Sequence, residues 1–388
     1  MKRMLHTLSA FGISPKGGEK AVLTCKTHIF MDDIIFSLQS IGGISVYWAS
    51  FLQQWQQSRF RNVVLIRRGD SKSILPIEES WRGESIYDNK LPLSLARLLP
   101  LLVKLPAYSL FHSSYLRYSL QKNVCSIITI HDLAAEIGMV TGWRARFKRF
   151  LQESAINRAN GIICVSETTR KKLLALYPKV AVEKTKVIHH GFSNQFYRLK
   201  QNEGRVNKTI LFVGGRAHYK NFKLCLRVIK KLDNFELILV GGGKLKACET
   251  NELNKACNGR WSHHDNVSVD QLNKFYNEAY CLLYPSLYEG FGMPVIEAMK
   301  AGCPVVCAGN EAVKEVAGDA VLIVNIDFDY NSYVDAILSL ESVAFREEII
   351  DKGLEKAGEY TIEKNFEETV GFYKEVFRKK FGRELEGL

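Results

Sequence analysis

The arrangement of apolar segments predicts an α/β protein with two similar domains. Short apolar runs alternate with stretches of helical periodicity, and the runs fall into two series separated by a polar segment at residues 194–208. Runs that are hydrophobic at nearly every position and alternate with helices are typical of parallel sheets covered on both faces. We therefore expect two Rossmann-like domains joined by a linker. The runs are residues 62–68, 126–133, 160–167, 186–191, 208–215, 235–243, 279–285, 303–309 and 320–324.

Five segments follow from this division, with a first strand expected near residues 27–30. They are an irregular N-terminal extension (1–26), a first domain (27–193), a linker (194–208), a second domain (209–361) and a final helical segment (362–388).

Targeting signals are not evident in the sequence. The first residues lack the apolar stretch and the cleavage site of a signal peptide. The most apolar window, residues 91–111, contains Arg97, Lys104 and three prolines, so we predict no transmembrane helix. Nine cysteines without CxxC pairs, several inside apolar runs, indicate a reduced cytoplasmic compartment.

The composition indicates a folded chain whose charge is uneven. Of the 388 residues, 46% are hydrophobic and 24% charged, which supports two cores. Residues 1–200 hold 29 Lys and Arg against 13 Asp and Glu, a balance of +16, whereas the remainder holds 24 against 28, a balance of −4. The basic half predicts a surface that meets phosphates of a nucleic acid, an acidic lipid or a phosphorylated acceptor, or simply a solvated lysine-rich face.

Polar residues follow several predicted strands, where ligands bind in open α/β sheets. Gly42 and Gly43 precede an expected helix, so their backbone could approach an anion at its N-terminus, or they form a plain tight turn. His131 ends a buried strand and either bonds a ligand or ties down the next loop. In the second domain Gly214 and Gly215 end a strand.

Arg216 and Lys220 come directly after those two glycines. A planar guanidinium and a compact ammonium suit two linked phosphates, although a solvated pair of cations would show the same pattern.

Residues 284–306, YPSLYEGFGMPVIEAMKAGCPVV, read as a strand end, a glycine turn and a helix in which Pro294 takes the first helical position. The amides at the helix start are orphan donors beside the positive end of the helix dipole and predict a diphosphate seat. Glu297, about one turn in, suits the cis-diol of a ribose, and Glu289 would face whatever lies beyond the phosphates. This geometry predicts a sugar-nucleotide site whose turn consists of Glu289, Gly290, Phe291, Gly292 and Met293.

These residues resemble a known family. Glu289 and Glu297 within EGFGMPVIEAMKAGCPVV are similar to the E-x7-E signature of retaining glycosyltransferases of family 4, which have the GT-B fold. GGRAHYKN resembles the strand end at which these enzymes bind the phosphates of the sugar donor. The resemblance covers nearly the whole chain from about residue 27 and includes, in this order, GGISVYW, HSSYLR, TIHDL, VSETTR and VIHHG. The resemblance implies parallel sheets that face each other across a cleft, with a C-terminal helix that crosses back to the first domain.

The resemblance also implies roles for individual residues. Arg216 and Lys220 would neutralise the donor pyrophosphate, and Glu297 would hold the ribose. The other implied roles are contacts to the transferred sugar by Glu289, a place beside the reacting centre for His131, and closure of the first-domain loop on the donor at Gly43.

The family implies a metal-independent enzyme without a cofactor. It would transfer a hexose from a nucleoside-diphosphate sugar to a glycan or lipid-linked acceptor, with acceptor binding in the first domain and donor binding in the second. Similarity of residues 32–48 to bacterial O-antigen enzymes favours GDP-mannose. Other functions stay open, namely a sugar-nucleotide epimerase, a phosphorylase or a nucleic-acid binder, although no RNA- or DNA-binding signature supports the last.

Other motifs carry weaker predictions. The carboxylates of residues 327–329 match the D-x-D of metal-dependent transferases but lie far from the phosphate loops. The Asp32–Asp33 pair lies on or just after the first strand and is expected to be structural, although Asp33 could touch an acceptor. The His-His pairs at 189–190 and 263–264 lack metal-ligand spacing, so no metal site is predicted. Glycines 241–243 either pass near the nucleotide or form a bare turn, and the loop 263–272 is expected at the nucleobase.

The segment 143–159 mixes basic and aromatic residues at helical spacing. It either lies on the anionic cytoplasmic face of the inner membrane or packs its aromatic residues in the core.

Overall fold

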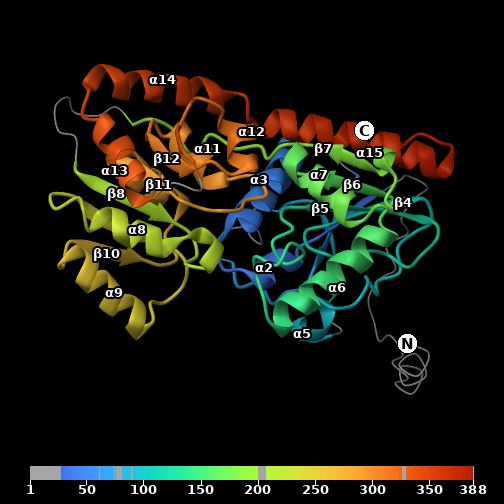
Figure 1. The fold of residues 1–388 in the computed structure, drawn as a ribbon. Helices are drawn as coiled ribbons and strands as arrows, with labels where there is room; N and C mark the ends of the chain where they lie inside the picture. The colour runs from blue at the N-terminus through green and yellow to red at the C-terminus, as the bar shows by residue number, and fades with distance from the viewer. Residues whose placement is uncertain are drawn as a thin grey trace.

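Two parallel sheets, each covered by helices, form the molecule (Figure 1). This computed structural model describes residues 28–60, 62–73, 75, 81–88, 91–199, 207–325 and 329–387, without the side chain of Arg144. The predicted two-domain α/β architecture is confirmed. The predicted N-terminal extension and residues 200–206 of the linker lie outside the described ranges.

The first sheet has the order β3-β2-β1-β4-β5-β6-β7, and every neighbouring pair is parallel. Its strands are β1 (Ile29–Asp32), β2 (Val63–Arg67), β3 (Glu84–Tyr87), β4 (Ser109–Ser113), β5 (Val124–Ile130), β6 (Gly161–Cys164) and β7 (Thr185–Val187). The helices of this domain are α2 (Ile34–Leu38), α3 (Gly43–Gln57), α5 (Leu93–Ala96), α6 (Trp143–Arg158) and α7 (Glu167–Leu176).

The second sheet has the order β10-β9-β8-β11-β12-β13 and is also parallel. Its strands are β8 (Thr209–Val213), β9 (Glu236–Val240), β10 (Trp261–His264), β11 (Cys281–Tyr284), β12 (Val305–Ala308) and β13 (Leu322–Val324). The helices are α8 (Phe222–Ile229), α9 (Ala247–Cys257), α10 (Val269–Glu278), α11 (Met293–Lys300), α12 (Glu311–Ala317), α13 (Tyr330–Ser339), α14 (Val343–Gly358) and α15 (Ile362–Phe381).

Strands β3, β4 and β10 were not among the predicted apolar runs. β3 and β10 are edge strands whose side chains are only partly buried, so their sequences lack a continuous apolar run. β4 is fully buried, but it lies at the end of the apolar window 91–111 and contains His112. Among the described residues, no helix is long and apolar enough to cross a membrane.

Helix α15, the last in the sequence, packs on the first domain (Figure 1). The ring of Phe366 lies 5.8 Å from that of Phe51 and 4.8 Å from that of Trp55, both on α3. At Gly161 a Cβ atom would lie 2.8 Å from Val376, so only glycine lets α15 approach the start of β6 this closely. The predicted return of the final helix to the first domain is confirmed.

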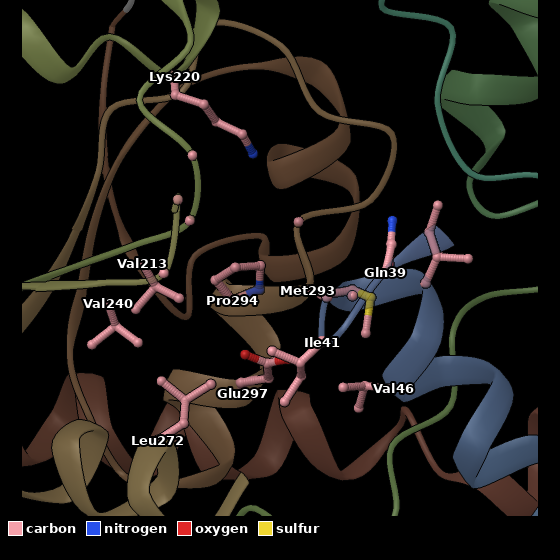
Figure 2. A pocket seen from close by; sticks show the side chains of 18 of the residues that line it. Gln39, Ile41, Val46, Val213, Lys220, Val240, Leu272, Met293, Pro294 and Glu297 are labelled. Atoms are coloured by element: carbon pink, nitrogen blue, oxygen red, sulfur yellow. The ribbon is translucent and has the colours of Figure 1, made fainter. Parts of the chain in front are cut away.

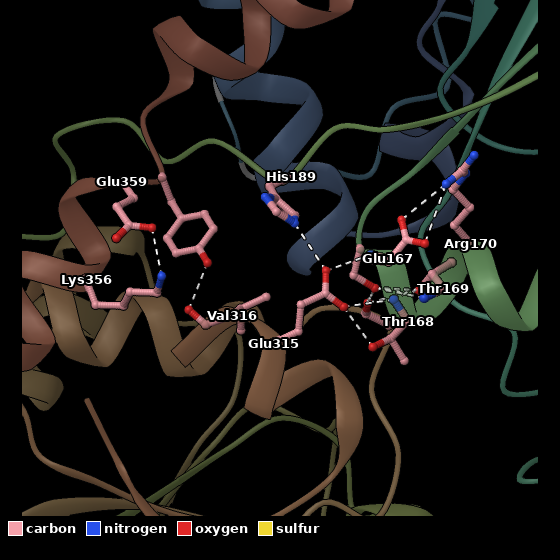
Figure 3. A network of polar contacts seen from close by, with 12 residues as sticks. Glu167, Thr168, Thr169, Arg170, His189, Glu315, Val316, Lys356 and Glu359 are labelled. Atoms are coloured by element: carbon pink, nitrogen blue, oxygen red, sulfur yellow. Dashed lines mark hydrogen bonds and ion pairs between the residues drawn. The ribbon is translucent and has the colours of Figure 1, made fainter. Parts of the chain in front are cut away.

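A polar contact that we call the α7 clasp joins the two domains (Figure 3). Glu315, on α12 of the second domain, accepts the backbone N–H groups of Glu167 and Thr168 at 2.6 and 2.8 Å and the Thr168 hydroxyl at 2.7 Å. These N–H groups are orphan donors at the start of α7, so a carboxylate from one domain caps a helix of the other.

The clasp also determines the ionisation of Glu315. His189 adds a contact at 3.3 Å. Burial by itself would raise the pKa of Glu315, but the contacts from His189, Thr168 and Glu167 hold that pKa down at about 2. The carboxylate is therefore charged at neutral pH and stabilises the closed arrangement of the domains.

Replacing Glu315 by Gln should lower the free energy of unfolding at pH 7 by about 2 kcal/mol, because the charge-assisted hydrogen bonds are lost. The folded pKa of about 2 lies below the ordinary value of 4.5, so the ionised carboxylate stabilises the fold fully above pH 4.5 and progressively less toward pH 2. The difference in the free energy of unfolding between wild type and E315Q, measured by urea denaturation, should therefore become smaller as the pH falls from 4.5 toward 2.

Glu311 provides the matched control, since its carboxylate on the same helix is 72% exposed. E311Q should change the free energy of unfolding by less than about 0.5 kcal/mol. If the difference in the free energy of unfolding between wild type and E315Q stayed constant below pH 4.5, the ionised Glu315 carboxylate would not stabilise the fold through the α7 clasp.

Candidate active site

A cavity of about 820 Å³ lies between the two domains (Figure 2). It is bounded by the carboxyl end of β5 in the first sheet and of β8, β9 and β11 in the second, and by the N-termini of α3 and α11. β8 and β11 are adjacent, and the connections run outward from them in opposite directions, so this is the switch point where open α/β sheets bind ligands. The predicted site residues that line it are Gly42, Gly43, His131, Gly215, Lys220, Glu289, Gly290, Phe291, Gly292, Met293 and Glu297.

The N-termini of α3 and α11 meet at this cavity from opposite domains. α11 begins at Met293, after Gly292 in a left-handed conformation with φ of 102°, so Pro294 is the second helical residue and not the first. α3 begins at Gly43, where a Cβ atom would lie 3.0 Å from the sulfur of Met293. Both helices direct orphan N–H groups and the positive ends of their dipoles toward the same region.

Glu297 is a buried carboxylate on α11, only 6% exposed, that lines the cavity. Burial raises the pKa of Glu297 to about 7, and a hydrogen bond donated by the Tyr276 hydroxyl at 2.9 Å opposes that rise. Tyr276, on α10, was not predicted from the sequence. It lies 21 residues before Glu297 and belongs to no motif, so only the packing of α10 against α11 brings the two together.

Lys220 and Glu289 form an ion pair with Nζ and Oε1 at 2.6 Å. Burial by itself would lower the pKa of Lys220, but the Glu289 charge raises it, so the ammonium keeps its proton. The Tyr284 hydroxyl lies 3.4 Å from the ammonium, and the rings of Tyr219 and Tyr284 have their centroids 5.4 Å from it. The sequence did not predict these two tyrosines.

Arg216 stands apart from the other predicted site residues, because it is not among the described residues that line the cavity. Its Nε donates to Glu249 at 3.0 Å, and its two terminal nitrogens donate to the carbonyls of residues 241–244 at 2.9–3.2 Å. A Cβ atom on Gly242 would lie 2.5 Å from the guanidinium. Arg216 therefore holds the glycine loop 241–243, which does line the cavity, and its predicted contact to the pyrophosphate stays a prediction.

His131 forms a pair with His190, which belongs to a His-His pair without metal-ligand spacing and for which the sequence predicted no role in the site. The two rings are nearly parallel, with centroids 5.1 Å apart, and Nδ1 of His131 lies 3.3 Å from Nε2 of His190. Tyr47 on α3 packs its ring edge-on against both. Burial lowers the pKa of His131 to about 3, and that of His190 is also well below its ordinary value, so both imidazoles are neutral at pH 7.

The loop of Glu289 and Gly290 presses directly on the first domain. A Cβ atom on Gly290 would lie 1.9 Å from the carbonyl oxygen of His131, so no other residue fits. The Gly290 carbonyl accepts the hydroxyls of Ser166 and Thr169 at 2.6 and 3.0 Å, beside the α7 clasp. This contact brings His131 of one domain next to Glu289 of the other.

The far end of the cavity is formed by the loop expected at the nucleobase. Residues 265–269 and Leu272 line it, together with Gln39, Ser40 and Ile41 of the first domain (Figure 2). The Ser40 hydroxyl donates to Asn266 at 3.1 Å across the domain boundary. Gln39 to Ile41 were missed because nothing in their residue types indicates a ligand.

The Asp32–Asp33 pair is not among the described residues that line this cavity, whereas glycines 241–243 and His190 of one His-His pair do line it. Asp32 is fully buried and bonds Ser113 and Ser114, while Asp33 is 5% exposed and accepts the N–H of Arg68. Residues 326–328, which contain most of the D-x-D motif, lie outside the described ranges. Within those ranges no group of three or more His, Cys, Asp or Glu is placed to hold a metal ion.

Comparison with known families accounts for both domains. A family model described as "Glycosyltransferase Family 4" matches residues 41–196, and one described as "Glycosyl transferases group 1" matches residues 193–356. The two matches overlap at residues 193–196 and together span residues 41–356, more than half of the chain. The chain belongs to glycosyltransferase family 4. The predicted family is confirmed, and the glycosyltransferase class is favoured over the epimerase, phosphorylase and nucleic-acid alternatives.

Named relatives of this glycosyltransferase include enzymes of O-antigen synthesis. The O-antigen chain mannosyltransferase RfbU of Salmonella typhimurium is 28% identical over 263 residues, which cover 64% of this chain and 73% of RfbU. The O-antigen chain mannosyltransferase B of Escherichia coli is 38% identical over 109 residues, only 28% of either chain.

Solved structures support the predicted GT-B fold. A sucrose-phosphate synthase from Thermosynechococcus elongatus matches with a TM-score of 0.69 at 17% identity, covering 91% of this chain and all of that one. HepE from Anabaena, in complex with UDP and glucose, matches with a TM-score of 0.67 at 13% identity, covering 89% and 99%. At such identities the likeness establishes the fold alone.

Proposed function

We propose that this protein is a retaining hexosyltransferase, with GDP-mannose as the favoured donor and a glycan or lipid-linked sugar as the acceptor, in bacterial lipopolysaccharide or surface-polysaccharide synthesis. The observation that carries the proposal is the convergence of Lys220, two helix N-termini and the buried Glu297 on one cavity. The mannosyltransferase names of two relatives support the choice of sugar.

In this proposal the donor takes one orientation in the cavity. Its diphosphate lies between the N-termini of α3 and α11, within reach of the Lys220 ammonium, because amides and a cation there compensate two negative charges. The ribose diol donates to Glu297, and the base extends to residues 265–269. The sugar then meets Glu289 and the pair of His131 and His190.

The reaction breaks the bond between the anomeric carbon and the diphosphate oxygen. Negative charge grows on the leaving diphosphate, where Lys220 and the helix amides stabilise it. The acceptor hydroxyl attacks from the face that the diphosphate leaves, and its proton passes to a phosphate oxygen, so no protein nucleophile takes part. Arg216 positions the glycine loop, and neutral His131 serves as a hydrogen-bonding group rather than as a cation.

No metal or cofactor has a step in this proposal. The Lys220 ammonium and the helix dipoles supply the positive charge that a metal ion would otherwise supply. We therefore expect the rate of donor turnover to be the same with and without EDTA.

Slow donor hydrolysis without acceptor tests the proposed function. Purified protein incubated with GDP-mannose, UDP-glucose and UDP-N-acetylglucosamine should release GDP faster than UDP. Lys220→Met should lower that rate about 100-fold or more, because it removes the cation at the leaving group.

Lys223, an exposed lysine on α8 three residues away, is the matched control. Lys223→Met should hydrolyse the donor at the wild-type rate. Equal rates for Lys220→Met and wild type, or hydrolysis of none of the three donors, would contradict the proposed donor site.

The pKa of Glu297 makes donor binding pH-dependent. Because the ionised carboxylate is the stronger acceptor for ribose hydroxyls, the donor KM should rise about tenfold between pH 8 and pH 6, as protonation near pH 7 removes the charge. Glu297→Gln should have a high KM that no longer varies with pH. Tyr276→Phe removes the hydrogen bond that lowers the pKa, so it should move the rise in KM to higher pH. Initial rates at varied donor concentration over this pH range give the KM values. If the donor KM of E297Q changed with pH in parallel with that of wild type, Glu297 would not be the group that binds the ribose.

Peripheral association with the anionic cytoplasmic face of the inner membrane is part of the proposal. Helix α6 was predicted either to lie on a membrane or to pack its aromatic residues in the core. In the structure two of its aromatic side chains are exposed and one packs against the core. Trp143 and Phe150 are 71% and 63% exposed, whereas Phe147 packs against the core. Arg146 and Arg149 are exposed on the same helix, which suits anionic headgroups.

Sedimentation with vesicles measures this association. A W143A/F150A variant should bind vesicles containing 30% phosphatidylglycerol at least about fivefold more weakly than wild type, since it loses most of the exposed apolar area of α6. Unchanged binding of this variant, or equal binding of wild type to neutral phosphatidylcholine vesicles, would rule out α6 as the contact.

A further inference from the structure

Asp132 is a carboxylate in the cavity to which the proposed donor assigns no partner. It follows β5, lines the cavity, and its side chain is 33% exposed. Its Oδ1 accepts the N–H of Ala134 at 3.1 Å and the Lys148 ammonium at 3.0 Å. Among the described residues, Oδ2 accepts from Lys148 alone, at 3.3 Å, so lone pairs of Oδ2 stay available to a ligand.

Lys148 holds this carboxylate in place from α6. Burial by itself would lower the pKa of Lys148, but the charge of Asp132 raises it, so the ion pair is present at neutral pH. Gln152, one turn further along α6, donates to the Asp132 backbone carbonyl at 2.9 Å. Two side chains of one helix therefore position both the carboxylate and the backbone of this residue.

A negative charge at this place does not suit the donor diphosphate. The side chains assigned to the phosphates and the ribose, Lys220 and Glu297, come from the second domain, and the first domain meets the phosphates only through backbone amides at the start of α3. The Asp132 side chain belongs to the first domain. Its neighbour His131 touches the Gly290 loop, and Asp132 lines the cavity together with Glu289 and Gly290, so it lies on the side of the cavity assigned to the reacting end of the donor. After Glu289 and Tyr219, its charge also contributes to the raised pKa of Lys220. The ligand that it meets there must offer hydrogen-bond donors and no negative charge.

We propose that Asp132, held by Lys148, binds the acceptor through hydroxyl groups of a neutral sugar at its terminus. Hydroxyls donate to the open side of Oδ2, whereas a uronic acid or a phosphate at the same position would be repelled. Asp132 orients the acceptor and takes no proton, because the proton of the attacking hydroxyl leaves with the diphosphate. This inference rests on the proposed transfer function and adds the chemical class of the acceptor.

Transfer to synthetic acceptors tests this inference, once wild type hydrolyses one donor. The probes are p-nitrophenyl glycosides of mannose, glucose, galactose and N-acetylglucosamine as neutral sugars, and of glucuronic acid as the anionic counterpart. Wild type should transfer to at least one neutral glycoside and at least about tenfold less to the glucuronide. Asp132→Asn should raise the acceptor KM about 10- to 100-fold, with the donor KM within about threefold of wild type.

Two further variants separate this role from a purely structural one. Lys148→Met leaves the carboxylate but removes its support, so it should raise the acceptor KM by a smaller factor. Glu153→Gln makes the same carboxylate-to-amide change on the exposed face of α6 and should leave the acceptor KM unchanged.

Four results would overturn the inference. The first is a D132N variant with an unchanged acceptor KM, and the second is a D132N variant whose donor KM rises as much as its acceptor KM together with a lower melting temperature. The third is a wild type that uses the glucuronide as well as, or instead of, the neutral glycosides. The fourth is transfer to none of the probes despite donor hydrolysis. Failure of wild type to hydrolyse any donor would instead contradict the proposed function itself.

Discussion

The site depends on the contact between the two domains at Gly43 and Gly290. At these positions a Cβ atom would lie 3.0 Å from the Met293 sulfur and 1.9 Å from the His131 carbonyl oxygen. No side chain fits at Gly290 against the backbone of His131, and Gly43 leaves the Met293 side chain in close contact. The N-termini of α3 and α11 therefore lie together, and their dipoles act on the same region. The α7 clasp holds the same arrangement from the other side through Glu315. Neither domain alone contains a complete site, so the site exists only where the two domains meet.

Burial gives the ionisable groups of the cavity different charge states. The Lys220 ammonium keeps its charge because Glu289 is paired with it, whereas the two histidines are neutral because burial penalises the imidazolium. Glu297 titrates near neutrality for the same reason. The positive charge is thereby concentrated at Lys220 and the helix ends, where the proposed leaving diphosphate would develop its charge, and the two histidines are neutral hydrogen-bonding groups in the same cavity.

Arg216 has partners within the chain that the family motif did not predict, while its predicted contact to the pyrophosphate stays a prediction. Its place after a strand-end glycine pair matches the motif, yet its guanidinium donates to Glu249 and to the carbonyls of residues 241–244. A loop of three glycines exposes many carbonyl oxygens, and a planar group with several donors satisfies them together. The motif predicted the position of the residue correctly, but its partners depend on a loop that lies 25 residues further along the chain.

The sequence by itself determined the two parallel-sheet domains, the family and most of the cavity wall, because apolar runs, glycine turns and helix starts are local features. The sequence indicated Glu289, Lys220 and His131 because they follow strands, and Glu297 because it lies in the first turns of the helix after a glycine turn. Only the tertiary structure decided which side chains meet them. Tyr276 reaches Glu297 through the packing of two helices, His190 reaches His131 across 59 residues of sequence, and Glu315 caps a helix of the other domain. Edge strands β3 and β10 were missed for a related reason, since half-buried strands need no apolar run and are defined by the neighbour with which they pair.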